Sequence, residues 1–317
     1  MSRAITMMSR AREYLTHRRS LGFELKTSGQ ILLEFARFAD HAGHHGPLKT
    51  KLILRWVARS DKHSAQYRSD RLSIVRGFAR HVAARDGCSE VPDARIIASG
   101  CRRRQPHIYT DKQVRDLITA AANLQPVYPW RGCTYATLFG LLASTGLRVS
   151  EALNLLKTDV DLKAGILHIR QAKFRKQRLV PMHPSVTQVI KRYAQRRDRD
   201  LAADSSVAFF VGRQGLPLPY STVRNTFRRL CARLKWRGNG VFPRPRIHDL
   251  RHSFACRRLL RWYHEGVDVD HAIASLSTYL GHGKVSDTYW YLTGTGELLS
   301  IAGERFERFA SPVRRHS

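Results

Sequence analysis

Apolar residues recur every three or four positions through the first part of the chain. The clearest stripes lie in residues 28–40, 50–57 and 64–84, and the first of them contains Ile31 and Phe35. This period is typical of amphipathic helices that bury one face and expose the other. The sequence therefore predicts a small helical bundle in this region.

The pattern is interrupted between residues 86 and 105. Glycines and a proline punctuate this stretch, and three consecutive arginines stand at positions 102–104. Turn-forming residues beside a run of like charge indicate a connection between domains. The predicted organisation is a helical domain over residues 1–95, a linker over 96–105 and a second domain over 106–317.

Helical spacing resumes after the linker, with one change of period. Thr110 opens a capping-box pattern, and a nearly all-apolar stretch at 136–144 ends at Gly146, which predicts a buried helix with a glycine terminator. Residues 166–169 and 178–181 are short strand-like runs on either side of a basic turn, which predicts an antiparallel hairpin. Further helices are predicted over residues 184–199, 222–236, 247–260, 271–280, 285–291 and 297–309. The predicted fold is thus mainly α-helical with a small antiparallel β-sheet, and the second domain belongs to the α+β class.

The net charge of the chain indicates which kind of binding partner to expect. The 317 residues include 55 Lys and Arg against 25 Asp and Glu, which is a formal net charge of +30. Because the cations are spread along the whole length, the pattern favours a protein that wraps a polyanion, and we expect double-stranded DNA. A membrane surface is the competing polyanion, but no apolar run approaches the roughly 18 residues that span a bilayer.

The N-terminal residues and the cysteines predict the compartment. The first residues lack the hydrophobic core of a signal peptide. The five cysteines are odd in number and scattered, with no Cys-x-x-Cys pair. This usage argues for a reducing cytoplasm and against a disulfide framework or a zinc knuckle. The expected location is the bacterial cytoplasm, in association with the nucleoid.

Two predicted helices carry arginines along their flanks. A charge run on a helix is usually a solvated face, but the helix over 64–84 has almost no acidic partners there, which favours contacts with DNA phosphates. The helix over 222–236 is a candidate for the major groove, since that groove admits a helix. The predicted DNA-binding residues are Arg68, Arg71, Arg76, Arg80, Arg224 and Arg228.

The segment from His248 to His252 reads His-Asp-Leu-Arg-His. On a helix, His248 and Arg251 lie one above the other, with His252 near the same face. The segment alone leaves three interpretations open. The histidines form a metal pair, as in the metalloprotease helix motif with Asp in place of Glu; an Arg and a His form a phosphate clamp; or the histidines are solvated on a basic helix.

Three other stretches decide between these interpretations. Arg148 follows a glycine turn and opens a helix, His282 follows Leu280-Gly281, and Tyr291 stands nine residues after His282. Two arginines, two histidines and a tyrosine suit an anion site with an oxygen nucleophile, and they do not suit a zinc site. In order and spacing, this set resembles the signature of the tyrosine recombinase (phage integrase) family over the C-terminal two-thirds of the chain.

The resemblance implies a role for each residue of the set. Arginines and histidines stabilise the charge that develops on a scissile phosphate, and a tyrosine attacks it. The implied general acid is a lysine on the hairpin. Lys173 matches it, although the family's flanking glycines are Ala172 and Phe174 here, and Lys176 is the alternative. The implied catalytic residues are Arg148, Lys173, His248, Arg251, His282 and Tyr291.

The role of Glu151 and the identity of the nucleophilic tyrosine each have alternative interpretations. Glu151, one turn after Arg148, either orients that arginine or is an ordinary surface residue of its helix. Tyr291 is preferred as nucleophile because of its offset from His282, with Tyr289 in reserve and Tyr279 a more distant third. A positive surrounding is expected to help the phenol react as phenolate.

The function implied by the resemblance is site-specific recombination. A recombinase of this type cuts DNA through a 3′-phosphotyrosyl link and rejoins it, in integration, excision or transposition of a mobile element. The ester keeps the bond energy, so no ATP, metal or other cofactor is expected, and the sequence has no P-loop and no acidic metal cluster. Three alternatives remain: a type IB topoisomerase-like enzyme, a non-catalytic DNA-binding protein of the same fold, and a zinc hydrolase built on His248 and His252.

The resemblance also implies an assembly. The first domain corresponds to a core-binding domain (SAM-like) and the second to the catalytic domain, and together they form a C-shaped clamp around DNA. The apolar stripe of the last helix, over residues 297–309, packs either on its own domain or on a neighbouring protomer. The expected states are a monomer when free and a homotetramer on synapsed DNA sites.

Overall fold

The computed structural model describes residues 6–59, 64–97, 105–170, 177–201, 206–238, 244–293 and 296–310. The chain divides into two compact units, Met1–Arg104 and Gln105–Ser317. Each unit has its own hydrophobic core. No helix in these ranges is long and apolar enough to cross a lipid bilayer.

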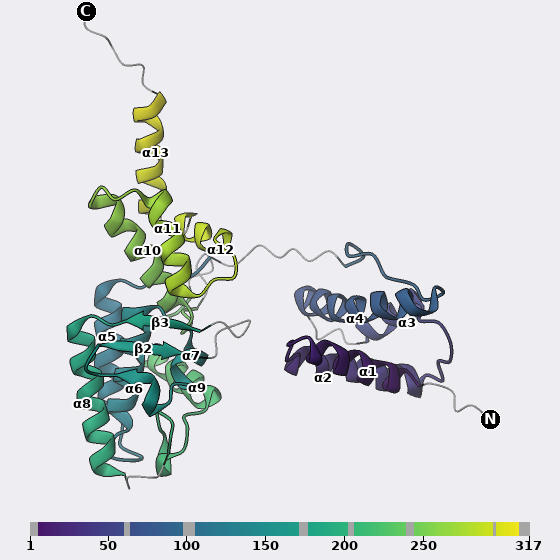
Figure 1. Cartoon of the computed structure of the whole chain (residues 1–317), viewed down its shortest axis with the longest axis horizontal. Coiled ribbons are helices and arrows are strands. Elements are labelled where there is room, and N and C mark those ends of the chain that lie inside the picture. Colours follow the sequence, from purple (N-terminus) through teal and green to yellow (C-terminus); the bar gives the residue numbers. More distant parts are fainter. Residues whose placement is uncertain are drawn as a thin grey trace, which may run out of the picture. The chain divides into compact units, whose positions relative to one another are not determined.

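The described part of the N-terminal unit is helical (Figure 1, purple to blue). Its helices are α1 (Met7–Ser20), α2 (Lys26–His41), α3 (Thr50–Val57) and α4 (Ala65–Asp86). The three helices that the sequence predicts are α2, α3 and α4, and their apolar stripes meet in one core around Phe35, Trp56 and Phe78. The first helix buries a narrower stripe that includes Ala11 and Leu15, and the pattern alone did not single it out.

The second unit combines helices with a small sheet, which confirms the predicted fold class. Its elements are α5 (Asp111–Ala122), α6 (Arg131–Thr145), α7 (Val149–Leu153), the 3-10 turn η1 (Lys157–Asp159), β1 (Val160–Asp161), β2 (Ile166–Ile169), β3 (Arg178–Pro181), α8 (Pro184–Asp200), the 3-10 turn η3 (Arg213–Gly215), α9 (Tyr220–Arg233), α10 (Asp249–His264), α11 (Val269–Leu280), α12 (Ser286–Tyr289), the 3-10 turn η4 (Trp290–Thr293) and α13 (Gly296–Ala310). The nearly all-apolar helix α6 is buried on most of its surface, and it contacts α5, α8 and α10. Residues of α5, α6 and α8 share one hydrophobic core with Leu167 and Val180 of the sheet (Figure 1).

The sheet is antiparallel, in the order β1-β2-β3 among the described strands. The predicted hairpin is present, with Leu167 opposite Val180. Both of these residues are buried and their neighbours along the strand are not, as expected for a sheet with one face on a core. The strand β1 was not predicted because two residues are too few to show a period.

Two helices of the second unit, α6 and α11, end at a glycine in the left-handed conformation. Gly146 ends α6 with φ +64°, and a Cβ at this position would lie 2.5 Å from Cδ1 of Phe254. Gly281 ends α11 with φ +68°, and a Cβ there would lie 2.7 Å from Nη1 of Arg178. The left-handed backbone and the close neighbours both require glycine.

Replacing Gly146 by Ala is expected to lower the free energy of unfolding by about 2 kcal/mol or more. The left-handed backbone costs an L-residue about 1–2 kcal/mol, and the Phe254 ring has to move in addition. Gly266→Ala is the matched control, because Gly266 has φ +71° and nothing within 4 Å of the added Cβ. Urea denaturation measures both variants, and equal losses would show that the contact with Phe254 is unimportant.

Candidate functional site

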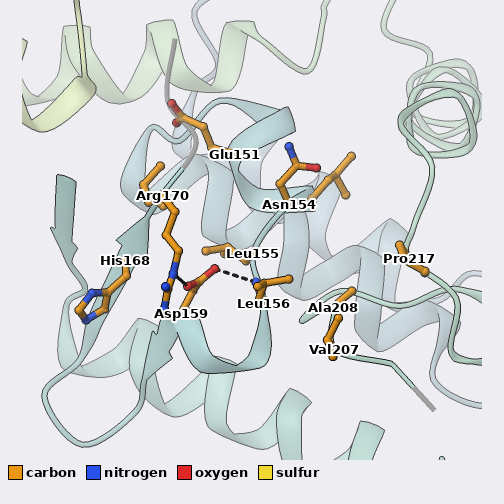
Figure 2. A pocket seen from close by; sticks show the side chains of 12 residues that line it. Glu151, Asn154, Leu155, Leu156, Asp159, His168, Arg170, Val207, Ala208 and Pro217 are labelled. Atoms are coloured by element: carbon orange, nitrogen blue, oxygen red, sulfur yellow. Dashed lines mark hydrogen bonds and ion pairs between the residues drawn. The ribbon is translucent and has the colours of Figure 1, made fainter. Parts of the chain in front are cut away.

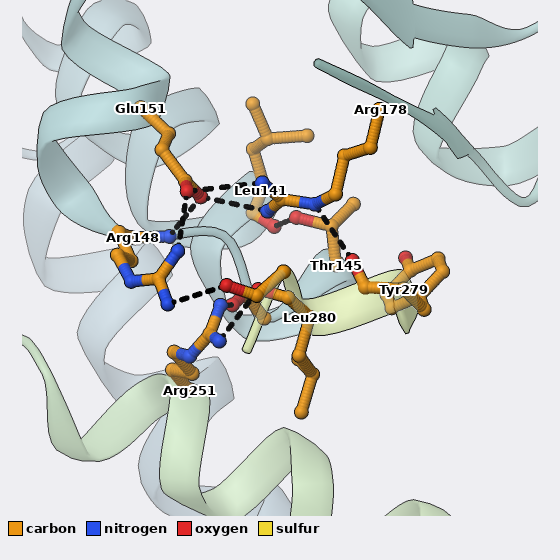
Figure 3. Close-up of polar contacts among 10 residues, drawn as sticks. Leu141, Thr145, Arg148, Glu151, Arg178, Arg251, Tyr279 and Leu280 are labelled. Carbon is orange, nitrogen blue, oxygen red and sulfur yellow. Dashed lines mark hydrogen bonds and ion pairs between the residues drawn. The ribbon is translucent and has the colours of Figure 1, made fainter. Parts of the chain in front are cut away.

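In the second unit, arginine side chains gather at the C-terminal ends of α6 and α11 (Figure 3). The last carbonyl groups of a helix have no partner inside the helix, and the helix dipole makes that end negative. Within the described residues, three arginines donate hydrogen bonds to these carbonyls: Arg148, Arg178 and Arg251. The two helix ends therefore hold a cluster of cations in fixed positions.

Arg251 lies in the first turn of α10 and is 2% exposed. Its Nη1 donates to the carbonyl oxygen of Gly146 (2.8 Å), and its Nη2 donates to the carbonyl oxygen of Leu280 (2.7 Å). Burial lowers the pKa of Arg251 to about 10, so the side chain remains a cation near neutral pH. This arginine is thus rigid and charged.

Arg148 is the N-cap residue of α7, directly after the turn that ends α6. Its Nη2 donates to the carbonyl oxygen of Gly281 (2.9 Å), and its Nη1 donates to Oε1 of Glu151 (2.7 Å). These two contacts fix the position of the Arg148 guanidinium group.

Glu151 is 5% exposed, which excludes an ordinary surface position. Besides Arg148, its carboxylate accepts from Nη1 (3.0 Å) and Nη2 (2.8 Å) of Arg178, the first residue of β3. Burial opposes ionisation of this carboxyl group, but the hydrogen bonds and charges of Arg178 and Arg148 outweigh it and hold the pKa of Glu151 below its ordinary value. Glu151 is therefore a buried carboxylate shared by two arginines.

Tyr291 lies in η4 and is 3% exposed. Its ring centroid is 5.8 Å from that of His282, which stacks on it, and 5.4 Å from that of His252. Burial raises the pKa of the Tyr291 phenol, and the charge and hydrogen bond of Arg251 lower it only in part. The sequence-based expectation was that nearby cations would favour the phenolate; in this structure burial is the larger effect.

The other two candidate tyrosines lie in different surroundings. Tyr289 is 44% exposed and is not part of the buried cluster that contains Tyr291. The ring of Tyr279 stacks on Phe254 at 5.7 Å, and burial raises its pKa to about 12. Among the three, Tyr291 is the one that contacts Arg251 and His282.

His282 follows the glycine that ends α11. Its Nδ1 lies 2.6 Å from the hydroxyl of the buried Thr288. Burial lowers the pKa of His282 to about 4, with Arg251 and Arg148 acting in the same direction, so the ring is neutral at pH 7. When the Thr288 hydroxyl donates to Nδ1, the single ring proton lies on Nε2, where it is available for a phosphate oxygen.

His248 and His252 meet edge to face, with ring centroids 4.8 Å apart. His248 is exposed, yet partial desolvation by the surrounding packing and the Arg251 charge lower its pKa. His252 is buried and packs on Trp290 as well as on Tyr291. Among the described residues, no group of three or more His, Cys, Asp or Glu side chains is placed to hold a metal ion.

Lys173 and its alternative Lys176 lie outside the described residues, in the gap between β2 and β3. The described ends of the hairpin both carry arginines in ion pairs: Arg170 pairs with Asp159, and Arg178 pairs with Glu151. A cavity of about 300 Å³ beside them is lined by Asp159, Arg170 and Glu151 among others (Figure 2). Of the predicted catalytic and orienting residues that the structure describes, only Glu151 borders it.

The predicted DNA-binding arginines differ in exposure. Arg224 and Arg228 are exposed, one turn apart on α9, and Arg80 is exposed on α4, whereas Arg68 and Arg76 are half-buried. Arg71 differs from the expected flank position, because it is 6% exposed and its guanidinium lies 3.7 Å above the Trp56 ring. A contact of this kind is a cation–π interaction within the unit.

Sequence reasoning missed two residues of the site. Arg178 was read only as the start of a strand, and Thr288 only as part of a helix. Arg178 reaches Glu151 across 27 positions and the Tyr279 carbonyl across 101 positions. Contacts at such separations leave no periodic pattern in one sequence.

Known proteins resemble the chain over most of its length. Residues 108–296 match the Phage integrase family. The chain is 38% identical over 310 residues to a Sinorhizobium fredii protein named as an integrase/recombinase, y4rB, and the match covers 96% of this chain and 98% of that protein. It is 31% identical over 316 residues to the tyrosine recombinase XerC of Rhodospirillum centenum, with 94% and 86% covered.

Solved structures share the fold. The Tn1549 transposon integrase in complex with a circular intermediate DNA has a TM-score of 0.68 at 16% identity, over 96% of this chain and 100% of that chain. A lambda integrase dimer bound to a COC′ core site has a TM-score of 0.63 at 19% identity, over 92% of this chain and 78% of that chain. The family match extends over more than half of the chain, and the chain therefore belongs to the phage integrase family of tyrosine recombinases, enzymes that break and rejoin DNA.

Proposed function

We propose that this recombinase cuts and rejoins DNA through a 3′-phosphotyrosyl intermediate on Tyr291. The phenolic oxygen attacks the scissile phosphorus, the bond to the 5′-oxygen breaks, and a 5′-hydroxyl leaves. A 5′-hydroxyl of the partner duplex then attacks the phosphotyrosyl ester and releases the tyrosine. In this proposal the reaction serves integration, excision or transposition of a mobile element.

The observation that supports the proposal most is the packing around Tyr291. This buried tyrosine contacts the Arg251 cation and stacks on His282, whereas Tyr289 is exposed. Attack by an oxygen nucleophile adds charge to the non-bridging phosphate oxygens, so fixed donors aimed there lower the barrier. Arg148, Arg251, His248 and His282 have this role in the proposal, and the phenolic proton of Tyr291 passes to water as the phenolic oxygen attacks.

The leaving 5′-oxygen needs a proton, because an alkoxide is a poor leaving group. In the proposal, Lys173 supplies it, with Lys176 as the alternative. The phosphotyrosyl ester keeps the energy of the broken bond for rejoining, so the reaction proceeds without ATP, metal ion or other cofactor.

A nicked suicide substrate tests the proposed reaction. Such a substrate loses a short fragment after cleavage, so the intermediate accumulates as a covalent protein–DNA adduct. We expect the full chain to form this adduct in the presence of EDTA and without ATP, on a duplex that carries its recombination site. Cleavage that needs a divalent metal ion, or recombination without any adduct, would overturn the proposal.

The partner in this proposal is double-stranded DNA, held by a clamp made from both domains, the core-binding domain over 1–95 and the catalytic domain over 106–317. The net charge of +30 and the exposed arginines of α9 support it. The Tn1549 and lambda integrase structures of the same fold also contain DNA.

Binding by such a clamp is expected to depend steeply on salt. If about six or more phosphates are neutralised, the affinity falls by about 10³ or more between about 50 and 200 mM salt, because counterions are released on binding. Fluorescence anisotropy with a labelled duplex measures this slope. A nearly constant affinity across that range would contradict a clamp that follows the DNA backbone.

The proposed assembly is a monomer that becomes a homotetramer on synapsed sites, through α13. The first turn of the helix packs on its own domain, because Leu298 is buried in the same core cluster as Tyr291. The exposed apolar residue Leu299 (53% exposed) supports a contact of the helix with a neighbouring protomer in this proposal. Deletion of residues 297–317 is expected to spare DNA binding, abolish recombination and disturb cleavage. Gel-shift and recombination assays measure these effects, and full-rate recombination by the truncated chain would show that the helix only packs on its own domain.

A further inference from the structure

We infer that Arg178 is a positioning residue for Arg148, because it neutralises Glu151 and so leaves the Arg148 cation available to a phosphate. The inference rests on the proposed function, since it deepens the role of the same site. Arg178 acts through Glu151 and does not touch the DNA.

The carboxylate of Glu151 has donors on both of its oxygens (Figure 3). Oε1 accepts from Nη1 of Arg148 (2.7 Å) and from Nη1 of Arg178 (3.0 Å). Oε2 accepts from the backbone N–H of Arg148 (2.9 Å) and from Nη2 of Arg178 (2.8 Å). An ionised carboxylate offers about four acceptor positions, so these four bonds use its full capacity and fix its orientation.

The side chains of Arg148, Arg178 and Glu151 differ in their exposure to solvent. The side chain of Arg148 is 24% exposed, whereas those of Arg178 and Glu151 are 9% and 2% exposed. Arg148 is therefore the most exposed member of this trio. Both Nη atoms of Arg178 donate to the carboxylate of Glu151. Its Nε donates to the carbonyl oxygen of Tyr279 (2.8 Å).

The charges of the trio explain why the second arginine is needed. Two guanidinium groups and one carboxylate leave one positive charge, which is placed on the accessible member. Without Arg178, the buried carboxylate would have Arg148 as its partner, and the pair would be neutral. A neutral pair stabilises the added charge of an attacked phosphate far less than a cation does.

Arg178 also ties β3 to the end of α11. The carbonyl group of Tyr279 accepts from Arg178, that of Leu280 from Arg251 and that of Gly281 from Arg148. Three successive carbonyls thus hold three arginines in register. A Cβ on Gly281 would lie 2.7 Å from Nη1 of Arg178, so the glycine is needed for this approach as well as for its φ.

The test asks whether removal of the Glu151 charge compensates for loss of the Arg178 charge. Single-turnover cleavage rates are measured on the suicide substrate and expressed per folded molecule. Arg178→Met is expected to slow cleavage about 10²-fold while the DNA affinity stays unchanged. In this variant Glu151 neutralises Arg148, and loss of one charged donor to a developing charge usually has about this effect. Adding Glu151→Gln removes the uncompensated carboxylate, so the double variant is expected to recover about 10-fold over Arg178→Met. Arg178→Lys, which keeps the charge, is expected to fall between Arg178→Met and the natural protein.

A matched control is Arg197→Met in α8. The side chain of Arg197 is 3% exposed, against 9% for Arg178, so it is at least as buried. It pairs with Asp198 and donates to the carbonyl oxygen of Phe209 (2.8 Å). Its loss is expected to destabilise the fold without changing the cleavage rate per folded molecule. An equal loss of rate in Arg197→Met would mean that any buried arginine has this effect, and the inference would be wrong.

Two further results would contradict the inference, and a third would contradict the proposed function. A double variant no faster than Arg178→Met would show that Arg178 acts by packing and not by charge. A substrate with sulfur in place of the 5′-bridging oxygen gives a thiolate leaving group that needs no acid, since a thiol has a pKa of about 8.5. Full rescue of Arg178→Met by this substrate would assign Arg178 to the leaving-group side, which overturns the inference. Absence of an adduct with the natural protein would instead refute the proposed function itself.

Discussion

Replacing Tyr291 by Phe is expected to abolish the covalent protein–DNA adduct while DNA binding remains normal. The substitution removes only the phenolic oxygen, and the ring still fills its place beside His282 and His252. Loss of a nucleophile lowers a rate by far more than loss of a single donor does, and we expect at least about a 10³-fold decrease in cleavage. Adduct formation on the suicide substrate, measured by gel electrophoresis, and binding, measured by anisotropy, separate the two effects.

The matched control is Tyr289→Phe, which removes a hydroxyl from an exposed ring two positions away. We expect this variant to cleave at the natural rate. A normal adduct from Tyr291→Phe, together with loss of the adduct in Tyr289→Phe, would reverse the assignment of the nucleophile.

Arg251→Lys is expected to lower the cleavage rate by about 10²–10³-fold. Lysine keeps the positive charge, but a compact ammonium cannot hold the carbonyl groups of Gly146 and Leu280 and also present a planar fork to a phosphate. Single-turnover cleavage at saturating enzyme measures the effect. Arg261→Lys, at an exposed position in the last turn of the same helix, is the control and is expected to cleave at the natural rate.

An unchanged rate in Arg251→Lys would mean that charge alone is sufficient at this position. The buried fork would then be a structural link between α6, α10 and α11, and Arg148 would be the principal arginine for the phosphate.

Local signals in the sequence predicted much of the fold. The strand-like runs at 166–169 and 178–181 coincide with β2 and β3, because alternation and flanking turns are local properties. Thr110 and Gln113 form the predicted capping box, and Gly146 and Gly281 end their helices in the left-handed conformation. These features depend on neighbours within a few residues, so one sequence is sufficient to find them.

The site was predicted less completely, because its contacts join distant positions. Helical direction does not distinguish Tyr289 from Tyr291, and the structure shows why: α12 gives way to a 3-10 turn at Trp290, which changes the angle between successive side chains. Arg71 has the spacing of a helix flank, yet its side chain covers the Trp56 ring. Neither outcome follows from the period of the surrounding residues.

The most direct test of a covalent enzyme is the identity of the residue that carries the DNA. The adduct formed on a suicide substrate is digested with a protease and a nuclease, and the peptide that retains a 3′-phosphonucleotide is sequenced by tandem mass spectrometry. The proposed function predicts the nucleotide on the phenolic oxygen of Tyr291. A nucleotide on Tyr289, on a serine or on any other side chain would contradict it.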